Sequence, residues 1–181
     1  HEGRAAVVDP GDPTPVLKTL EEQGLALDTI IITHHHFDHT GGVSALKKAT
    51  GCRVIGPDNP KIADIDETMT EGARVTVLGY GFEIMEVPGH TLDHIAYYNA
   101  EDGTLFCGDT LFVGGCGRVF EGTFPMMQQS LAKLSHLPCE TKVYCTHEYT
   151  MANLSFARKV EPTNADLSAH IDSCQKQRDN D

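Results

Sequence analysis

The sequence predicts a layered α/β (α+β) protein in which sheets and helices pack face to face. Apolar, β-branched runs typical of buried strands alternate with helical segments over residues 5–57. After these segments come two pairs of strands, over residues 74–89 and 94–109, with glycine at or beside each turn. A helix, a strand and further helical segments complete the chain. This order of elements is typical of sheets covered by helices.

The first part of the chain is predicted to alternate strands with helices. Prolines at its start and Gly24 past its end indicate a helix over residues 13–24. Gly51 ends a second helix over residues 43–51. The strands expected here span residues 5–11, 28–33 and 53–57.

The second part is predicted to contain paired strands before its helices. Two strands over 74–79 and 82–89 join at a glycine-flanked turn, and 94–109 form a hairpin around Asp102-Gly103. Beyond Glu161 the composition is polar, so residues 165–181 are at best a solvated helix. The remaining predictions are a helix over 126–137, a strand over 142–145 and a helix over 151–160.

Charge and composition exclude several classes of function. The formal net charge of −12 argues against a general nucleic-acid binder, which needs a basic face. The sequence contains no apolar run long enough to span a bilayer, so we expect no membrane partner. The six cysteines form no C-x-x-C pair, which favours reduced thiols in a cytoplasmic protein.

The most informative stretch is "THHHFDHTGG", residues 33–42. Side chains alternate in an extended chain, so His34, His36 and Asp38 can share one direction while His35 points elsewhere. The flexible Thr40-Gly41-Gly42 turn is expected to bring His39 back toward the same cavity. Such a density of imidazoles and carboxylates is a strong sign of metal binding.

Three further candidates follow apolar strands. His90 ends "VPGH", Asp109 ends "FCGD" and His147 ends "VYCTH". Because strands that end at the same edge of a sheet end close together in space, these side chains can converge with the histidine cluster. Seven N and O donors are too many for one tetrahedral ion and suit two adjacent divalent ions. Surface or packing roles are expected for His35, His94, His136 and His170.

Four motifs in this order resemble the metallo-β-lactamase superfamily, and within it the glyoxalase II (hydroxyacylglutathione hydrolase) branch. They are T-H-x-H-x-D-H, P-G-H-T, G-D-T-L-F and H-E-Y-T, and residues 108–122 and 146–150 narrow the resemblance to that branch. The resemblance implies an αββα sandwich that lacks the family's first strands and has a truncated C-terminal helical region. We accordingly expect a catalytic domain over residues 1–160 and an incomplete substrate-binding region over 161–181.

The resemblance also implies a division of the ligands. One divalent metal ion would be held by His34, His36 and His90, and the second by Asp38, His39 and His147. Asp109 would bridge the ions together with a hydroxide, and Asp38 and Asp109 would be the catalytic carboxylates. Zinc is the expected metal, with iron or manganese as alternatives.

The implied reaction is hydrolysis of the thioester S-D-lactoylglutathione to D-lactate and glutathione, in methylglyoxal detoxification, by a monomer. Arg118 matches a family cation for the substrate carboxylates. Tyr149 matches a tyrosine near the glutathione, and Phe120 replaces a tyrosine of some members. Asp93 replaces a family glycine at a place where glycine could serve a positive φ.

Other functions stay open at this point. A persulfide dioxygenase would use one iron with two histidines and an aspartate. A β-lactamase or a phosphodiesterase could share the fold. The chain could also be a metal-binding but inactive fragment of the hydrolase.

Overall fold

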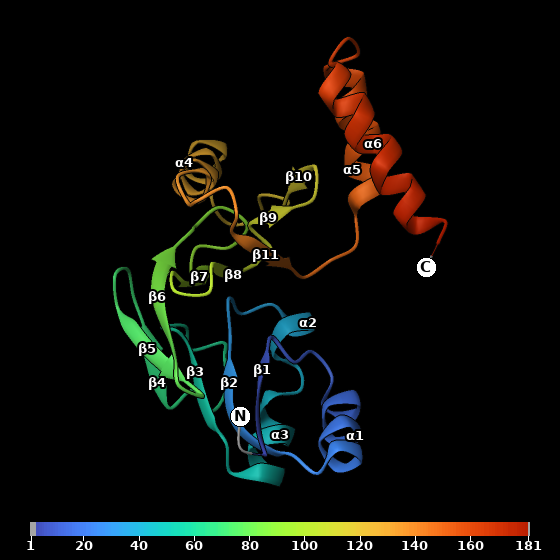
Figure 1. The fold of residues 1–181 in the computed structure, drawn as a ribbon. Helices are drawn as coiled ribbons and strands as arrows, with labels where there is room; N and C mark the ends of the chain where they lie inside the picture. Colours follow the sequence, from blue (N-terminus) through green and yellow to red (C-terminus); the bar gives the residue numbers. More distant parts are fainter. Residues whose placement is uncertain (1–2, 181) are drawn as a thin grey trace.

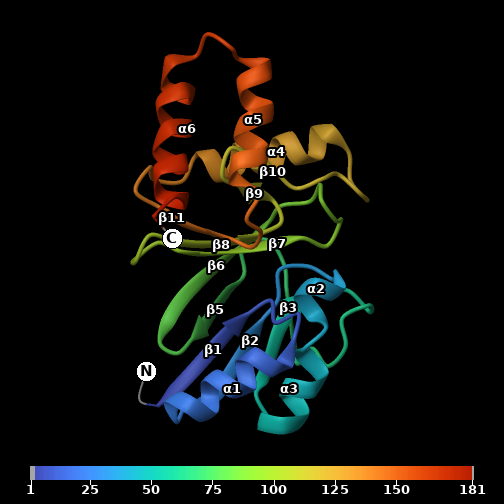
Figure 2. The ribbon, with the colours of Figure 1, turned by 90° about the vertical axis from the view of Figure 1, so that its right-hand side faces the viewer.

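The computed structural model describes residues 3–180 and shows two sheets packed face to face with helices on both outer sides. In Figure 2, α1 (Pro13–Gln23) and α3 (Val43–Thr50) cover the first sheet. On the other side, α4 (Phe124–Ser135) covers the second sheet (Figure 1). The layers therefore follow the αββα order.

The first sheet is parallel throughout, with the order β1-β2-β3-β4. Gly24 ends α1 in a left-handed conformation, as predicted, and Asp12 begins the helix by accepting the amide of Thr14. Gly51 ends α3 in the same way. The strands of this sheet are β1 (Arg4–Val8), β2 (Ala26–Ile31), β3 (Arg53–Pro57) and β4 (Glu67–Met69).

The second sheet has the order β11-β8-β7-β6-β5. Its neighbours are antiparallel except for β11, which pairs with β8 in parallel. Consequently β6, β8 and β11 run in the same direction and end at the same edge. Its strands are β5 (Arg74–Val77), β6 (Tyr80–Glu86), β7 (Ile95–Asn99), β8 (Thr104–Gly108) and β11 (Lys142–Cys145).

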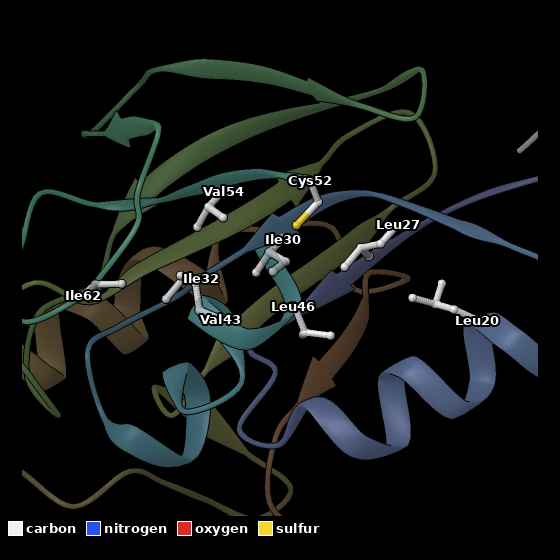
Figure 3. Close-up of a cluster of buried hydrophobic side chains, with 9 residues drawn as sticks. All are labelled: Leu20, Leu27, Ile30, Ile32, Val43, Leu46, Cys52, Val54 and Ile62. Carbon is white, nitrogen blue, oxygen red and sulfur yellow. The ribbon is translucent and has the colours of Figure 1, made fainter. Parts of the chain in front are cut away.

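Strand alternation divides the apolar core between the layers. Ile30 and Ile32 face α1 and α3, whereas Ile31 between them faces the second sheet. In β7, Ile95 and Tyr97 fill the space between the sheets, while the opposite face of that strand packs toward α4. The side chains under α1 and α3 are shown in Figure 3: Leu20, Leu27, Ile30, Ile32, Val43, Leu46, Cys52, Val54 and Ile62.

Two helices, α5 (Thr150–Val160) and α6 (Ala165–Arg178), pack side by side at one end of the sandwich (Figures 1 and 2). The expectation of a merely solvated helix over the last residues is wrong in one respect. Ile171 and Cys174 are buried against Leu154 of α5, so α6 has one apolar face. That face contains too few apolar residues to reveal itself in a polar sequence.

The other predicted strands and helices are confirmed, with small shifts in their bounds. Three short elements escaped prediction besides β4: α2 (Phe37–Thr40) and the hairpin of β9 (Leu111–Phe112) with β10 (Gly115–Cys116). Elements of two to four residues are too short to show periodicity. Within residues 3–180, none of the helices combines the length and apolarity that a membrane span requires.

Candidate metal centre

The histidine-rich segment begins where β2 ends. His36, with φ −61° and ψ 146°, starts the single helical turn of α2. The amides of His39 and Thr40 both donate to the carbonyl of His36, at 3.0 and 3.1 Å. This helical turn returns His39 toward the cavity. The predicted turn into α3 is present at Gly41 and Gly42, but α2 and not the glycines returns His39, and Gly41 adopts a right-handed helical conformation.

Gly41 and Gly42 instead permit close packing on the loop after β1. A Cβ at Gly41 would lie 2.6 Å from the carbonyl oxygen of Gly11, and one at Gly42 would lie 2.7 Å from that of Pro10. The amide of Gly42 donates to the same Pro10 oxygen at 2.8 Å. Larger residues at these positions would therefore push α2 and its ligand candidates away from the loop.

His34, His36 and His90 form the first ligand group, with donor atoms within 4.8 Å of one another. Nδ1 of His36 lies 3.0 Å from Nε2 of His90, and the ring of His34 meets both rings at steep angles. Nε2 of His34 is buried and has no hydrogen-bond partner among residues 3–180. A buried, unsatisfied nitrogen is costly unless it binds a cation.

Asp38, His39 and His147 form the second ligand group, again with donor atoms within 4.8 Å. Oδ2 of Asp38 lies 3.3 Å from Nε2 of His147 and 3.6 Å from Nε2 of His39. Asp38 and His39 belong to α2, whereas His147 follows β11. The fold thus brings together donors that are far apart in sequence.

Asp109 lies between the two groups, directly after β8. Its Oδ2 is 3.4 Å from Nε2 of both His90 and His147, and its Oδ1 is 3.3 Å from Nε2 of His39. The hydroxyl of Thr146 donates to Oδ1 at 2.8 Å. One carboxylate therefore contacts imidazoles of both groups.

Asp9 supports this arrangement and was missed in the sequence. It follows β1 at a φ of 47° and accepts the amide and the hydroxyl of Thr33, each at 2.7 Å. Its Oδ2 also lies 3.0 Å from Nδ1 of His39. Similarly, Nδ1 of His90 lies 2.7 Å from the carbonyl of Arg118. Partners on the outer nitrogens orient metal-binding histidines in this way.

His94 is the second supporting residue that sequence reasoning missed. The predicted packing role is correct, because the side chain is fully buried. In addition, its Nε2 accepts the amide of Asp109 at 3.0 Å, and its ring stacks on His34 with centroids 4.6 Å apart. The only sequence signal was the spacing of four residues from His90.

The surroundings of the two ligand groups shift the pKa values of His34 and His39 in opposite directions. Burial, reinforced by neighbouring imidazoles, lowers the pKa of His34 far below its usual range, so its lone pair is available at neutral pH. Burial also opposes the charged form of His39, but the carboxylates of Asp109, 3.3 Å from Nε2, and of Asp9, 3.0 Å from Nδ1, outweigh it and raise the pKa to about 10. For Asp109, burial is outweighed by the nearby imidazole of His39 and the hydrogen bond from Thr146, and the pKa falls to about 2.

The residues present fit a divalent cation. Imidazole nitrogen and ionised carboxylate oxygen are donors that zinc, iron and manganese all accept. The partnerless Nε2 of His34 points to the same conclusion. A cation at the second group would have to displace the proton of His39, so binding there is coupled to pH.

A cavity of about 430 Å³ opens beside both ligand groups. Residues that were predicted to contact substrate line it together with the ligand candidates. Arg118 extends its guanidinium over the ring of Phe120, 5.2 Å from the centroid. The lining comprises His36, Asp38, His90, Asp109, Phe112, Gly117, Arg118, Phe120 and Tyr149.

The remaining histidines among residues 3–180 lie outside these two groups. Nδ1 of His35 lies 2.9 Å from Oδ1 of Asp93. His136 is exposed at the end of α4, and His170 lies on α6. The idea of a positive φ at Asp93 is wrong: among the described residues, only Asp9, Asp64 and Leu78 have positive φ without being glycine. Asp93 instead uses its carboxylate for hydrogen bonds.

Comparison with known families assigns the whole chain. Residues 1–147 match the family described as the metallo-beta-lactamase superfamily, and residues 148–181 match the hydroxyacylglutathione hydrolase C-terminus. The chain belongs to the hydroxyacylglutathione hydrolase (glyoxalase II) family of that superfamily. The predicted boundary at residue 160, between the catalytic domain and the C-terminal substrate-binding region, stays a prediction.

Curated relatives agree with this membership. A hydroxyacylglutathione hydrolase of Ectopseudomonas mendocina is 59% identical over 177 residues, which cover 97% of this chain and 69% of the relative. One of Pseudomonas aeruginosa is 56% identical over 180 residues, 98% of this chain and 70% of the relative. The chain thus spans somewhat more than two thirds of these proteins.

Solved structures confirm the fold. The BLEG-1 B3 metallo-beta-lactamase superposes with a TM-score of 0.74 at 25% identity, over 81% of this chain and 82% of that chain. The protein TTHA1623, determined in a di-iron-bound form, gives a TM-score of 0.70 at 31% identity, over 78% and 80%. The predicted metallo-β-lactamase sandwich is therefore correct.

Proposed function

We propose that this family member is a thioester hydrolase that converts S-D-lactoylglutathione to D-lactate and glutathione with two divalent metal ions. The single observation that carries the proposal is the place of Asp109, whose carboxylate contacts imidazoles of both ligand groups. Relatives named hydroxyacylglutathione hydrolase support the substrate class.

In this proposal each ligand group holds one ion. His34, His36 and His90 hold the first, Asp38, His39 and His147 hold the second, and Asp109 serves both. Such a pair of ions supplies a water of lowered pKa and polarises the thioester carbonyl. Zinc suits these ligands, as do iron and manganese, and a similar protein was determined in a di-iron-bound form.

The chain's own carboxylates orient the attacking water. Asp38 and Asp109 both line the cavity, and 59% of the Asp38 side chain is exposed there. They can accept hydrogen bonds from a water between the groups and direct its lone pair at the carbonyl carbon. A thiolate leaves far more easily than an alkoxide, because the pKa of a thiol lies far below that of an alcohol, so expelling it requires no strong general acid.

Arg118, Phe120 and Tyr149 are proposed to bind the glutathione part. Arg118 is exposed at the cavity and can bind a carboxylate with two parallel hydrogen bonds. The ring of Tyr149 stacks on that of His147, with centroids 5.3 Å apart, so it borders the second group. Phe120 lies against the rings of His36 and His90 and provides an apolar wall.

The test is hydrolysis of S-D-lactoylglutathione by the metal-loaded protein, with metal counted in the same sample. We expect turnover with about two ions per chain, and Asp109→Asn should lower kcat at least 100-fold. Asp172→Asn, on the exposed side of α6, is the matched control and should behave like the wild type. One iron per chain with oxygen uptake on glutathione persulfide would overturn the proposal.

A further inference from the structure

A cluster of polar side chains lies beside the first ligand group. Nδ1 of His35 is 2.9 Å from Oδ1 of Asp93, and Asn59 donates to the other Asp93 oxygen at 2.8 Å. Nζ of Lys61 is 3.2 Å from Nε2 of His35 and 3.2 Å from Oε1 of Glu121. We call these five residues the anchoring cluster.

The anchoring cluster joins four loops of the cavity rim. His35 precedes α2, Asn59 and Lys61 lie between β3 and β4, Asp93 precedes β7, and Glu121 lies between β10 and α4. The side chains of His35 and Asp93 are only 8% and 9% exposed, so this pair forms a fixed base. Lys61, 61% exposed, closes the cluster from the solvent side.

The cluster is better explained by ion pairing than by a third metal site. Donor atoms of His35, Asp93 and Glu121 do lie within 4.8 Å of one another. However, the ammonium group of Lys61 already contacts both His35 and Glu121. A cation bound at the same place would be repelled by that charge.

Glu121 connects the cluster to residues that face the substrate cavity. Its Oε2 accepts the amide of Leu92 at 3.1 Å. The amide of Phe120 donates to the carbonyl of His90 at 3.2 Å, and Nδ1 of His90 lies 2.7 Å from the carbonyl of Arg118. The segment 118–121 is therefore fixed to the His90 loop by its backbone and to the other rim loops by Glu121.

We propose that Lys61 and Glu121 are positioning residues, which hold Arg118 and Phe120 in place for binding the glutathione part of the substrate. Neither side chain lines the cavity, so they act through the segment 118–121. This inference rests on the proposed function. It predicts that the ion pair determines substrate affinity and leaves the rate of the chemical step and the metal ligands unchanged.

The test compares Lys61→Met, Glu121→Gln and the double variant with the wild type. Each single variant should raise KM for S-D-lactoylglutathione about 3- to 5-fold, as expected for a partly exposed ion pair, with kcat within about 2-fold. The double variant should be no worse than either single one, because both remove the same pair. Lys61→Arg keeps the positive charge and should therefore have the KM of the wild type.

Lys133→Met is the matched control, because Lys133 of α4 forms a comparably exposed ion pair with Glu71, which lies between β4 and β5, and neither residue lines the cavity. It should leave KM unchanged. Metal content, and the dissociation constant of glutathione measured by calorimetry, complete the test.

Three outcomes would each overturn the inference: unchanged KM and glutathione affinity in Lys61→Met and Glu121→Gln, a fall in kcat alone, or loss of metal. If the wild type does not hydrolyse the thioester, the proposed function fails, and glutathione affinity alone decides the inference.

Discussion

Nε2 of His94 accepts the backbone amide of Asp109 at 3.0 Å while the same ring stacks on His34. One buried imidazole thus fixes both the carboxylate that contacts the two ligand groups and a member of the first group. Burial, followed by repulsion from His90, lowers the pKa of His94 to about 3. At neutral pH its Nε2 therefore keeps the lone pair that the amide needs.

Replacing His94 by phenylalanine should preserve a flat ring but leave the amide of Asp109 without its acceptor. We expect kcat to fall about 10- to 100-fold, the range seen when partners of metal ligands are removed. Glutamine at this position can still present an acceptor and should recover part of the loss. His136→Phe, at an exposed histidine, is the control. Unaltered kcat and metal content in His94→Phe would contradict the positioning role.

Gly108 precedes Asp109 at a φ of 48° and has no space for a side chain. A Cβ there would lie 2.3 Å from the hydroxyl of Thr33 and 2.7 Å from the His94 ring. Gly72 has a similar φ of 72°, but a Cβ there would meet no described atom within 4 Å.

The two glycines therefore separate backbone strain from steric conflict. Gly72→Ala should lower the free energy of unfolding by about 1 kcal/mol, the cost of a left-handed conformation. Gly108→Ala should lower it by about 2–5 kcal/mol, because overpacking is added. Urea unfolding of both variants measures the difference, and equal losses would show that the space around Gly108 is unimportant.

The ligand candidates could be predicted because each follows an apolar strand in a local pattern. His90, Asp109 and His147 come after β6, β8 and β11, which end at one edge of the second sheet. Strand ends and histidine spacing are visible in the sequence, so the meeting of these residues followed without coordinates. The αββα layers followed from the resemblance.

The supporting residues could not be predicted, because long-range packing determines their roles. Asp9 meets His39 only through the positive φ after β1 and the return of α2. Lys61 and Glu121 are joined only when their loops fold onto the same rim. Likewise, the apolar face of α6 exists only against α5. None of these contacts leaves a periodic signal in the sequence.

Arg118→Met should weaken substrate binding with little effect on the chemical step. The loss of a charged hydrogen-bond donor to a carboxylate predicts a KM about 10-fold higher, with kcat within a few-fold. The wild-type KM should rise with salt and that of the variant should not, because screening weakens the removed attraction. Arg74→Met, on the exposed face of β5, is the control. An equal salt dependence of KM in the wild type and Arg118→Met would show that Arg118 does not bind the substrate carboxylate.

After chelation of the metal, the stability of the protein should be greatest near pH 6.5, because His39 and His94 titrate in opposite senses. The pKa of His39 is raised from 6.5 to about 10, so its contribution is complete below 6.5 and is lost as pH rises toward 10. The pKa of His94 is lowered from 6.5 to about 3, so its contribution is complete above 6.5 and is lost as pH falls toward 3.

Urea unfolding of the chelated protein across this pH range measures the profile. Asp9→Asn removes one carboxylate partner of His39, so it should flatten the alkaline decline and spare the acidic one. Restoring the metal should also flatten the alkaline decline, since a cation on His39 replaces the proton. A free energy of unfolding that rises above pH 6.5 in the chelated wild type would show that His39 does not carry a proton between Asp9 and Asp109.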